Sequence, residues 1–219
     1  MGTTTLDAQQ QTASDRSNAE TAVVGGGKAY LLTKRFFDIV MSALGMVLLL
    51  IPMLIIAAMV KLDSEGPAIF RQERLGLNGK PFMMYKFRSM YEDAETEGPK
   101  WAERNDVRCT RLGKILRKTR LDELPQLYNI FIGDMSIVGP RPERACFYDE
   151  FEKYIPHFRQ RLLVQPGLTG HAQVNGGYEL GPEEKIVFDL EYMRRRSFLM
   201  DMQCIWKTVL VVLKRDGAR

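Results

Sequence analysis

The feature that most constrains this chain is a long apolar run, residues 38–60, which carries Pro52 in its middle and ends against Lys61. As a straight helix the run would be about 34 Å long, enough to cross an apolar bilayer core of about 30 Å. Pro52 removes a backbone hydrogen bond and conflicts with the carbonyl four residues earlier, so the helix should break there. Lys34 and Arg35 precede the run, so positive charge does not assign its ends to opposite sides. A re-entrant helix and a single kinked crossing both fit.

The rest of the chain divides into a tail and one domain. Residues 1–28 contain no aromatic side chain and are rich in small and polar residues, so we predict a disordered tail. Residues 29–63 form the membrane-associated segment. Residues 64–219 are enough for one catalytic domain with a single core. The three cysteines are widely spaced, without a zinc or disulfide pattern, which favours a reducing, cytoplasmic setting.

Several local patterns predict the elements of that domain. Short apolar runs at 68–70 and 81–87, separated by glycine and asparagine, predict a β-hairpin. Apolar residues at helical spacing among cations predict a basic amphipathic helix at 112–116. A similar period at 198–213 predicts a helix that lies in the lipid headgroup region, although a core helix fits equally well. The predicted fold class is α/β and α-rich.

The most suggestive pair for chemistry is Asp122 and Glu123, which precede Pro125. Proline favours the first turn of a helix, so both carboxylates would lie at a helix N-terminus, where backbone donors favour anions. Arg117 and Arg120 add positive charge, which would keep Asp122 ionised and nucleophilic. The same carboxylates could hold Mg²⁺, which shares oxygen ligands with substrate phosphates. An ordinary helix cap is the alternative interpretation.

Two later segments favour phosphate or nucleotide binding. Residues 133–142 form a turn-rich run that would hold Arg141 on a restrained backbone, and a fixed guanidinium suits bidentate phosphate binding. Residues 165–177 combine glycines with amide and hydroxyl side chains. This composition suits a nucleotide-binding loop, although ordinary loops share it.

Taken together, these segments resemble a known family. The motifs that carry the resemblance are residues 34–38, 86–90, 121–126, 133–142 and 166–176. They occur in the order found in the bacterial sugar transferase family, whose members are polyprenyl-phosphate hexose-1-phosphate transferases, also called monotopic phosphoglycosyl transferases. The resemblance covers roughly residues 34–214, and several ordered motifs together are more specific than any single one.

The resemblance implies a fold and a reaction. The fold is a re-entrant helix hairpin broken at Pro52, joined to a small catalytic domain on the cytoplasmic side of the inner membrane, with interfacial amphipathic helices. In the reaction, Asp122 attacks the β-phosphate of a UDP-sugar and releases UMP. The enzyme-bound phosphosugar then passes to polyprenyl phosphate, such as undecaprenyl phosphate. Glu123 completes the catalytic pair and Mg²⁺ assists. The product starts a surface glycan such as exopolysaccharide, capsule or O-antigen.

The resemblance also implies binding residues and partners. The expected substrate and phosphate contacts are Lys86, Arg88, Arg117, Arg141, Thr169, Gln173 and Asn175. The expected partners are a UDP-sugar, a polyprenyl phosphate and the lipid bilayer, with a homodimer left open and no nucleic acid. The sequence departs from the family at four positions: Ile51 for a frequent serine, Gln165 for a basic residue, His171 for an aromatic residue and Gly177 for a frequent arginine.

Three other functions compete with this interpretation. A non-enzymatic module that binds anionic lipids would explain the cations and the apolar run, but not the position of Asp122 and Glu123. A nucleic-acid binder is favoured only by the basic patch and scattered aromatic residues, and no nucleic-acid motif is present. A phosphohydrolase that forms a phosphoaspartate would release its product to water without a lipid acceptor.

Overall fold

The structure is a computed structural model that describes residues 24–94, 96, 98, 106–176 and 180–214. Its helices are α2 (Lys28–Leu48), α3 (Leu50–Asp63), α4 (Arg111–Thr119), α5 (Gln126–Ile132), α6 (Ala145–Phe151), α7 (His171–Asn175), α8 (Pro182–Arg195) and α9 (Phe198–Lys214). Its strands are β1 (Ile69–Leu75), β2 (Pro81–Phe87), β3 (Ser136–Val138) and β4 (Gly167–Thr169). Short 3₁₀ turns are η1 (Leu77–Gly79), η2 (Leu121–Glu123) and η3 (Phe158–Leu163).

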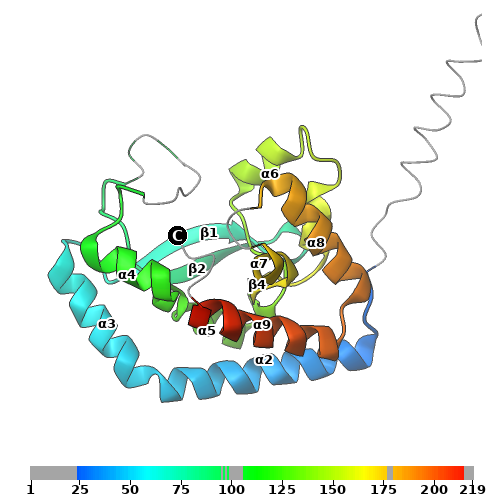
Figure 1. Ribbon diagram of the computed structural model, residues 1–219, viewed down its shortest axis with the longest axis horizontal. Coiled ribbons are helices and arrows are strands. Elements are labelled where there is room, and N and C mark those ends of the chain that lie inside the picture. The colour runs from blue at the N-terminus through cyan, green and yellow to red at the C-terminus, as the bar shows by residue number, and fades with distance from the viewer. Residues whose placement is uncertain (1–23, 95, 97, 99–105, 177–179, 215–219) are drawn as a thin grey trace, which may run out of the picture.

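The apolar run forms two helices, α2 and α3, which meet at an angle of 63° (Figure 1). The break lies at Leu49, whose φ of −97° and ψ of 6° leave the helical region. Pro52 lies in the first turn of α3, and its ring conflicts with a straight helix at the carbonyl of Leu48. The predicted break at Pro52 is therefore three residues too late, because proline disturbs the turn before it.

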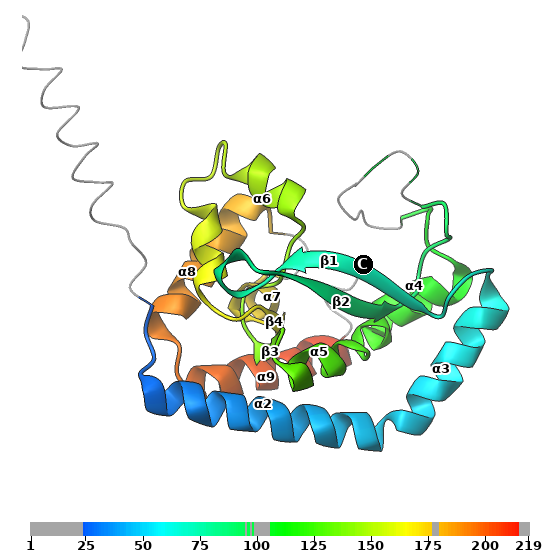
Figure 2. The ribbon, with the colours of Figure 1, turned by 180° about the vertical axis from the view of Figure 1, so that it is seen from behind.

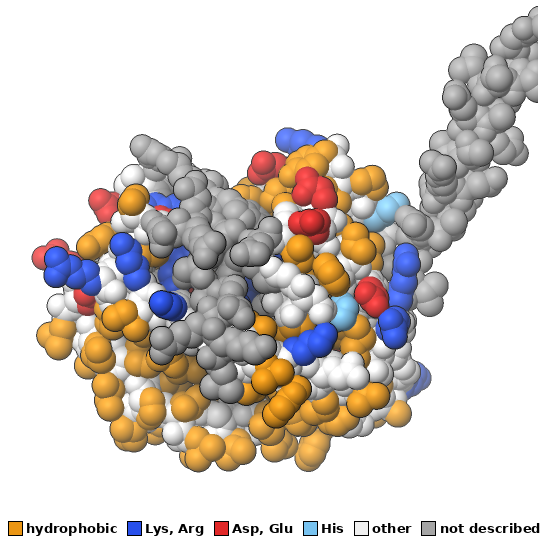
Figure 3. Space-filling view, viewed as in Figure 1, with side chains coloured by type: hydrophobic (Ala, Val, Ile, Leu, Met, Phe, Trp, Pro, Cys, Tyr) orange, Lys and Arg blue, Asp and Glu red, His pale blue; other side chains and the backbone are white. Residues whose placement is uncertain are grey.

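Length and composition limit what these helices can do. Among the described residues, no single helix is long and apolar enough to span a bilayer, and only the bent α2–α3 pair meets that requirement. The pair exposes many apolar side chains, including Leu32, Phe36, Val47, Leu48, Ile51, Leu54, Ile55 and Leu62. Figure 3 shows hydrophobic side chains gathered along the lower edge of the molecule, where Figure 1 places α2. An apolar surface of this extent marks an interaction face.

The predicted hairpin is confirmed as β1 and β2, which pair antiparallel from Ile69 opposite Phe87 to Leu75 opposite Pro81. A second, parallel pair joins β3 to β4 (Figure 2). Helices account for most of the regular structure and the two sheets are small, in agreement with an α-rich α/β fold. The core beneath the hairpin packs β2 against α5 through Phe82, Met84, Ile130 and Met135.

The predicted basic helix is α4, and the predicted C-terminal helix is α9. The N-terminal boundary differs from the prediction. Val24 packs against the apolar cluster of α8 and α9, and the Gly25 N–H donates to the Met193 carbonyl at 2.8 Å. Residues 24–28 are therefore not part of a disordered tail, and residues 1–23 lie outside the described residues.

A buried carboxylate joins α2 to the rest of the fold. Asp201 on α9 is 2% exposed and accepts hydrogen bonds from Tyr192 at 2.8 Å, Lys34 at 2.9 Å and Tyr30 at 3.0 Å. Tyr30 and Lys34 belong to α2, whereas Tyr192 belongs to α8. The network therefore fixes α2 against the rest of the domain.

Replacing Asp201 should destabilise the fold strongly. Asp201→Ala leaves the Lys34 ammonium buried without its counter-charge, so we expect a loss of about 3–5 kcal/mol in the free energy of unfolding. Asp149→Ala is the matched control, because Asp149 pairs with Arg159 at an exposed site and should cost less than about 1 kcal/mol. Chemical unfolding of both variants would check this, and equal stabilities would refute the structural role of Asp201.

Candidate active site

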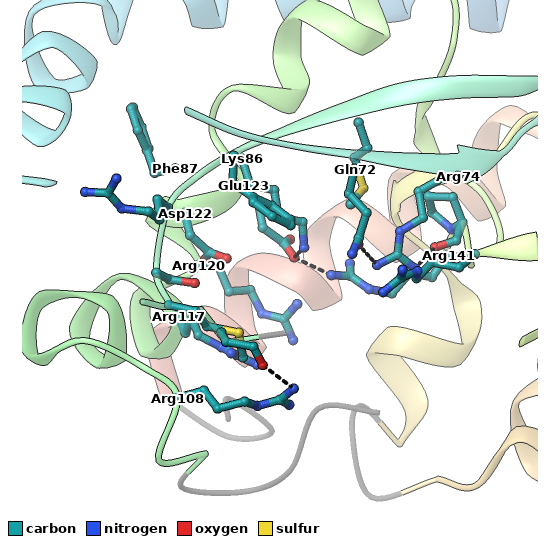
Figure 4. Close-up of a pocket in the computed structure, with 18 of the residues that line it drawn as sticks. Gln72, Arg74, Lys86, Phe87, Arg108, Arg117, Arg120, Asp122, Glu123 and Arg141 are labelled. Carbon is teal, nitrogen blue, oxygen red and sulfur yellow. Dashed lines mark hydrogen bonds and ion pairs between the residues drawn. The ribbon is translucent and has the colours of Figure 1, made fainter. Parts of the chain in front are cut away.

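A cavity of about 460 Å³ opens between the hairpin, α4, η2 and the segment after β3. Figure 4 shows Asp122 and Glu123 inside it, with Arg141 reaching Glu123 and with Arg117 and Arg108 nearer Asp122. The lining is rich in cations: Arg74, Lys86, Arg88, Arg108, Arg117, Arg120, Arg141, Arg144 and Lys185. Such a surface attracts anions of high charge, and phosphates above all.

Close packing of α4 brings Arg117 to the cavity. Thr110 caps the helix by accepting a hydrogen bond from the Gly113 N–H at 2.9 Å. A side chain at Gly113 would place its Cβ 2.0 Å from the Ser89 carbonyl oxygen, so only glycine allows this approach to the segment after β2. Arg117 then lines the cavity and donates to the Cys109 Sγ at 3.1 Å.

A sharp turn brings Asp122 and Glu123 into the cavity. Arg120 ends α4 in the left-handed region, with φ of 57°, which is uncommon for a residue with a side chain. The chain then forms η2, in which the Asp122 and Glu123 side chains are buried, although the prediction had them at the start of a helix. The next helix, α5, begins only at Gln126, and neither carboxylate accepts a hydrogen bond from its backbone.

Glu123 is held by two cations from different elements. Its Oε1 accepts a hydrogen bond from Arg141 at 2.5 Å and lies 3.4 Å from the Lys86 Nζ. Burial opposes ionisation of Glu123, but Arg141 and Lys86 outweigh it and lower its pKa to about 2. Glu123 is therefore a fixed negative charge that orients two cations toward the cavity.

Asp122 has the opposite character. Burial, together with the charge of Glu123, raises its pKa to about 6, against the opposing charges of Lys86, Arg141 and Arg117. The prediction that the surrounding arginines keep Asp122 ionised counted the charges that lower its pKa but not the desolvation that raises it. At pH 7 the carboxylate still exceeds the acid form by about tenfold. No described residue forms an ion pair or hydrogen bond with the Asp122 carboxylate, which leaves it available to a ligand.

Arg88 lines the cavity, but one of its nitrogens is hydrogen-bonded to backbone carbonyls. Its Nη2 donates to the Val60 carbonyl at 3.2 Å and to the Ser64 carbonyl at 2.6 Å, at the end of α3. Its Nε and Nη1 are buried without a hydrogen-bond partner among the described residues. Arg88 thus connects the end of α3 to the cavity wall.

The predicted nucleotide loop is not gathered into the cavity. The Thr169 hydroxyl lies 2.6 Å from the Thr208 hydroxyl, and Asn175 accepts from Lys207 at 2.9 Å, so both contact α9. Gln173 lines a small neighbouring cavity beside Arg141. Thr169, Gln173 and Asn175 therefore do not line the main cavity. Gln173 donates to the Leu168 carbonyl at 2.9 Å.

The positions that depart from the family pattern lie elsewhere as well. Gln165 donates to the Gly133 carbonyl, and His171 lies 3.4 Å from Glu191. Neither lines the main cavity. Gly177 lies outside the described residues.

Sequence reasoning missed several cavity residues, namely Gln72, Arg74, Arg144 and Lys185. A signal for two of them was present. Gln72 and Arg74 are two positions apart on β1, and alternate residues of a strand share one face. Arg74 donates to Glu143 at 3.0 Å and to the Pro142 carbonyl at 3.2 Å, so it borders the segment that carries Arg141. Arg144 and Lys185 required the tertiary structure.

Comparison with known proteins now decides the family. The sequence matches the family described as bacterial sugar transferase over residues 29–215. The chain belongs to this family. It is 41% identical to a UDP-N-acetylgalactosamine-undecaprenyl-phosphate N-acetylgalactosaminephosphotransferase from Aeromonas hydrophila, over 87% of the chain and 46% of the relative.

Two further relatives have related names. The chain is 44% identical to a UDP-glucose:undecaprenyl-phosphate glucose-1-phosphate transferase from Xanthomonas campestris, over 86% of the chain and 40% of the relative. It is 49% identical to a putative undecaprenyl-phosphate N-acetylgalactosaminyl 1-phosphate transferase from Bacillus subtilis, over 61% of the chain and 74% of the relative. The chain spans less than half the length of the first two relatives.

The carboxylates fit a magnesium ion only if the substrate contributes ligands. Among the described residues no three acidic, histidine or cysteine side chains lie together in a metal-binding group. Glu123 is already paired with two cations, whereas Asp122 has no such partner. This donor set suits Mg²⁺, which is commonly held by one or two carboxylates together with substrate phosphates and water. It does not suit a metal held by the protein alone.

The charge of Glu123 should control the titration of Asp122. In Glu123→Gln the repulsion is removed while the nearby cations remain, so the pKa of Asp122 should fall below about 6. Carbon NMR of protein labelled at aspartate would measure it, with Asp122→Asn to assign the signal. Glu143→Gln is the control, since Glu143 pairs with Arg74 and should affect Asp122 less. An unchanged or higher pKa in Glu123→Gln would contradict this account.

Proposed function

We propose that this chain transfers a sugar 1-phosphate from a UDP-sugar to polyprenyl phosphate, such as undecaprenyl phosphate, through a covalent intermediate on Asp122. The product would begin assembly of a surface polysaccharide. The observation that carries the proposal is the contrast between the two carboxylates. Asp122 lacks a bound partner in a cationic cavity, whereas Glu123 is held by Lys86 and Arg141. The names of the relatives support the substrate class.

In the first step, an ionised oxygen of Asp122 attacks the β-phosphorus of the UDP-sugar. A new bond forms between that oxygen and phosphorus, while the bond from phosphorus to the bridging oxygen of the α-phosphate breaks. UMP leaves with that oxygen, and the sugar phosphate stays on Asp122 as an acyl phosphate ester. Arg141 and Lys86 stabilise the charge of the transferring group, because cations near the equatorial oxygens lower the barrier.

In the second step, a phosphate oxygen of the lipid acceptor attacks the same phosphorus. The bond to Asp122 breaks and the carboxylate is regenerated, so the product is a diphosphate-linked lipid sugar. Dividing the transfer at one residue lets a soluble donor and a lipid acceptor use the cavity in turn. Arg117 at the Asp122 end of the cavity would bind the acceptor phosphate.

Magnesium would add to these charges. When bound by Asp122 and Glu123 together with substrate phosphates, Mg²⁺ would neutralise charge on the phosphoryl oxygens. The cavity's own cations orient the diphosphate and offset the repulsion between it and the two carboxylates.

We extend the proposal to the bilayer. The exposed apolar side chains of α2 and α3, together with Leu199 and Trp206 on α9, would lie in the cytoplasmic leaflet of the inner membrane. The 63° bend at Leu49 supports a re-entrant path, since both ends of the pair contact the same domain. A cavity that faces the cytoplasm would then receive a soluble UDP-sugar, while the lipid acceptor arrives along the membrane surface.

Removing the Asp122 nucleophile should abolish turnover. We expect purified wild type to release UMP from one UDP-sugar in a panel, only with undecaprenyl phosphate and Mg²⁺ present. Asp122→Asn keeps the size of the side chain but lacks the anionic oxygen, so we expect a loss of at least about 10³-fold. Multiple-turnover UMP release measures both, with melting temperature as the check of folding.

Other outcomes separate the rival functions. UMP or sugar phosphate released equally well without lipid would indicate a phosphohydrolase. Full activity in Asp122→Asn would exclude Asp122 as the nucleophile. Absence of UMP with every donor, together with unchanged membrane binding in Asp122→Asn, would favour a lipid-binding module.

A re-entrant path predicts that the N-terminal tail and the domain lie on one side of the membrane. Cys146 is exposed on α6 and serves as the reporter for the domain. Thr3→Cys in a Cys146→Ser background serves as the reporter for the tail. In sealed vesicles, a membrane-impermeant thiol reagent should reach both reporters from the same side. Labelling of the two from opposite sides would show a single crossing.

A further inference from the structure

A buried ion pair lies beside the segment that carries Arg141. The Arg161 Nε on η3 donates to the Asp189 Oδ2 on α8 at 2.7 Å, and both side chains are 2% exposed. Neither side chain touches the two carboxylates of the active site in any described contact. The pair nevertheless borders the small cavity that Arg141 also lines.

Arg161 uses a second nitrogen to hold the backbone of Arg141. Its Nη2 donates to the Arg141 carbonyl oxygen at 2.9 Å. The peptide just before Arg141 is fixed from the other side, since the Gly167 N–H donates to the Pro140 carbonyl at 2.9 Å. After Arg141, the Pro142 carbonyl accepts from Arg74. Arg161 thus completes a set of contacts that holds three successive carbonyls.

The position of that backbone decides where the Arg141 guanidinium lies. Arg141 stands between two prolines, which fix their own φ angles, so the main local freedom left is rotation about the bonds of Arg141 itself. Rotation about the N–Cα bond of Arg141 moves its carbonyl and its side chain together, and so would carry the guanidinium away from Glu123, which it now reaches at 2.5 Å. A hydrogen bond to that carbonyl opposes the rotation.

Only an arginine can make both contacts at once. The planar fork of Arg161 points one N–H at Asp189 and another at the Arg141 carbonyl, and its face lies over the Phe158 ring, 4.8 Å from the guanidinium carbon to the ring centroid. Lysine has a single nitrogen, which can keep the ion pair but cannot reproduce the fork. Buried ion pairs add little net stability over apolar residues, so orientation is the distinctive contribution of this one.

We propose that Arg161, oriented by Asp189, is a positioning residue that sets the direction of Arg141 toward the substrate phosphates. The inference rests on the proposed function, because it concerns the same cavity. Asp189 neutralises and orients Arg161, Arg161 holds the Arg141 carbonyl, and Arg141 contacts Glu123 and the transferring phosphoryl group. Loss of the link therefore affects donor binding without removing any group that touches the substrate.

A double-mutant cycle tests this link. The variants are Arg161→Lys, Arg141→Ala and the double variant, each measured for kcat and KM by UMP release. Arg161→Lys should lower kcat/KM for the UDP-sugar by about tenfold to a hundredfold, mainly through KM, as expected when a phosphate-binding group is displaced by about 1 Å. In the Arg141→Ala background the same substitution should change kcat/KM by less than about twofold, because the group it positions is gone. Calorimetric titration with UDP gives the same cycle from Kd where turnover is too slow.

Two variants keep the test specific. Arg159→Lys is the matched control, since Arg159 lies in the same 3₁₀ segment but pairs with Asp149 at an exposed site, and it should behave as wild type. Asp189→Asn is the second variant if Arg161→Lys does not fold, because asparagine keeps the shape and one acceptor oxygen while the charge is lost. It should show the same KM defect and the same dependence on Arg141.

The outcomes are distinct. An active wild type with equal losses from Arg161→Lys in both backgrounds would overturn the inference and leave the proposed function intact. Wild-type kcat/KM in both Arg161→Lys and Asp189→Asn would do the same. Absence of UMP release from well-folded wild type would overturn the proposed function and this inference with it.

Discussion

The interaction on which the site depends is the burial of one carboxylate, Glu123, between two cations. Lys86 comes from β2, Arg141 from the segment after β3 and Glu123 from η2, so three elements distant in sequence meet at one charge. Ionising Glu123 without Arg141 and Lys86 would cost several kcal/mol, since a buried charge loses its hydration. The same charge raises the pKa of its neighbour Asp122. One fixed anion therefore orients the cations and sets the ionisation of the candidate nucleophile.

Helices α2 and α3 are connected to the same domain as the cavity. Asp201 fixes the start of α2 through Tyr30 and Lys34, whereas Arg88 holds the end of α3 through the carbonyls of Val60 and Ser64. Both ends of the bent pair are thus tied to the domain by buried polar contacts. A shift of α3 would be transmitted to the cavity wall through Arg88, because buried hydrogen bonds are costly to leave unpaired.

Local sequence patterns predicted the elements whose own residues show a clear hydrophobic period or turn motif. The hairpin, the basic helix α4 and the C-terminal helix α9 follow from periodicity and turn residues, and the structure confirms them. The break near Pro52 was predicted, but its position at Leu49 depends on how the preceding turn relaxes. The composition of the loop at 165–177 did not decide between a nucleotide site and a helix contact, because glycine and polar side chains serve both equally well. Thr169 and Asn175 contact α9 instead.

The sequence by itself determined the apolar run, the adjacent carboxylates and the ordered motifs that define the family, because each is a property of neighbouring residues. Only the tertiary structure decided the ionisation of those carboxylates, since desolvation and the charges of Lys86 and Arg141 come from distant parts of the chain. It also decided that Arg144 and Lys185 line the cavity and that Arg161 holds Arg141. Burial and long-range pairing are properties of the packed chain, and no local pattern encodes them.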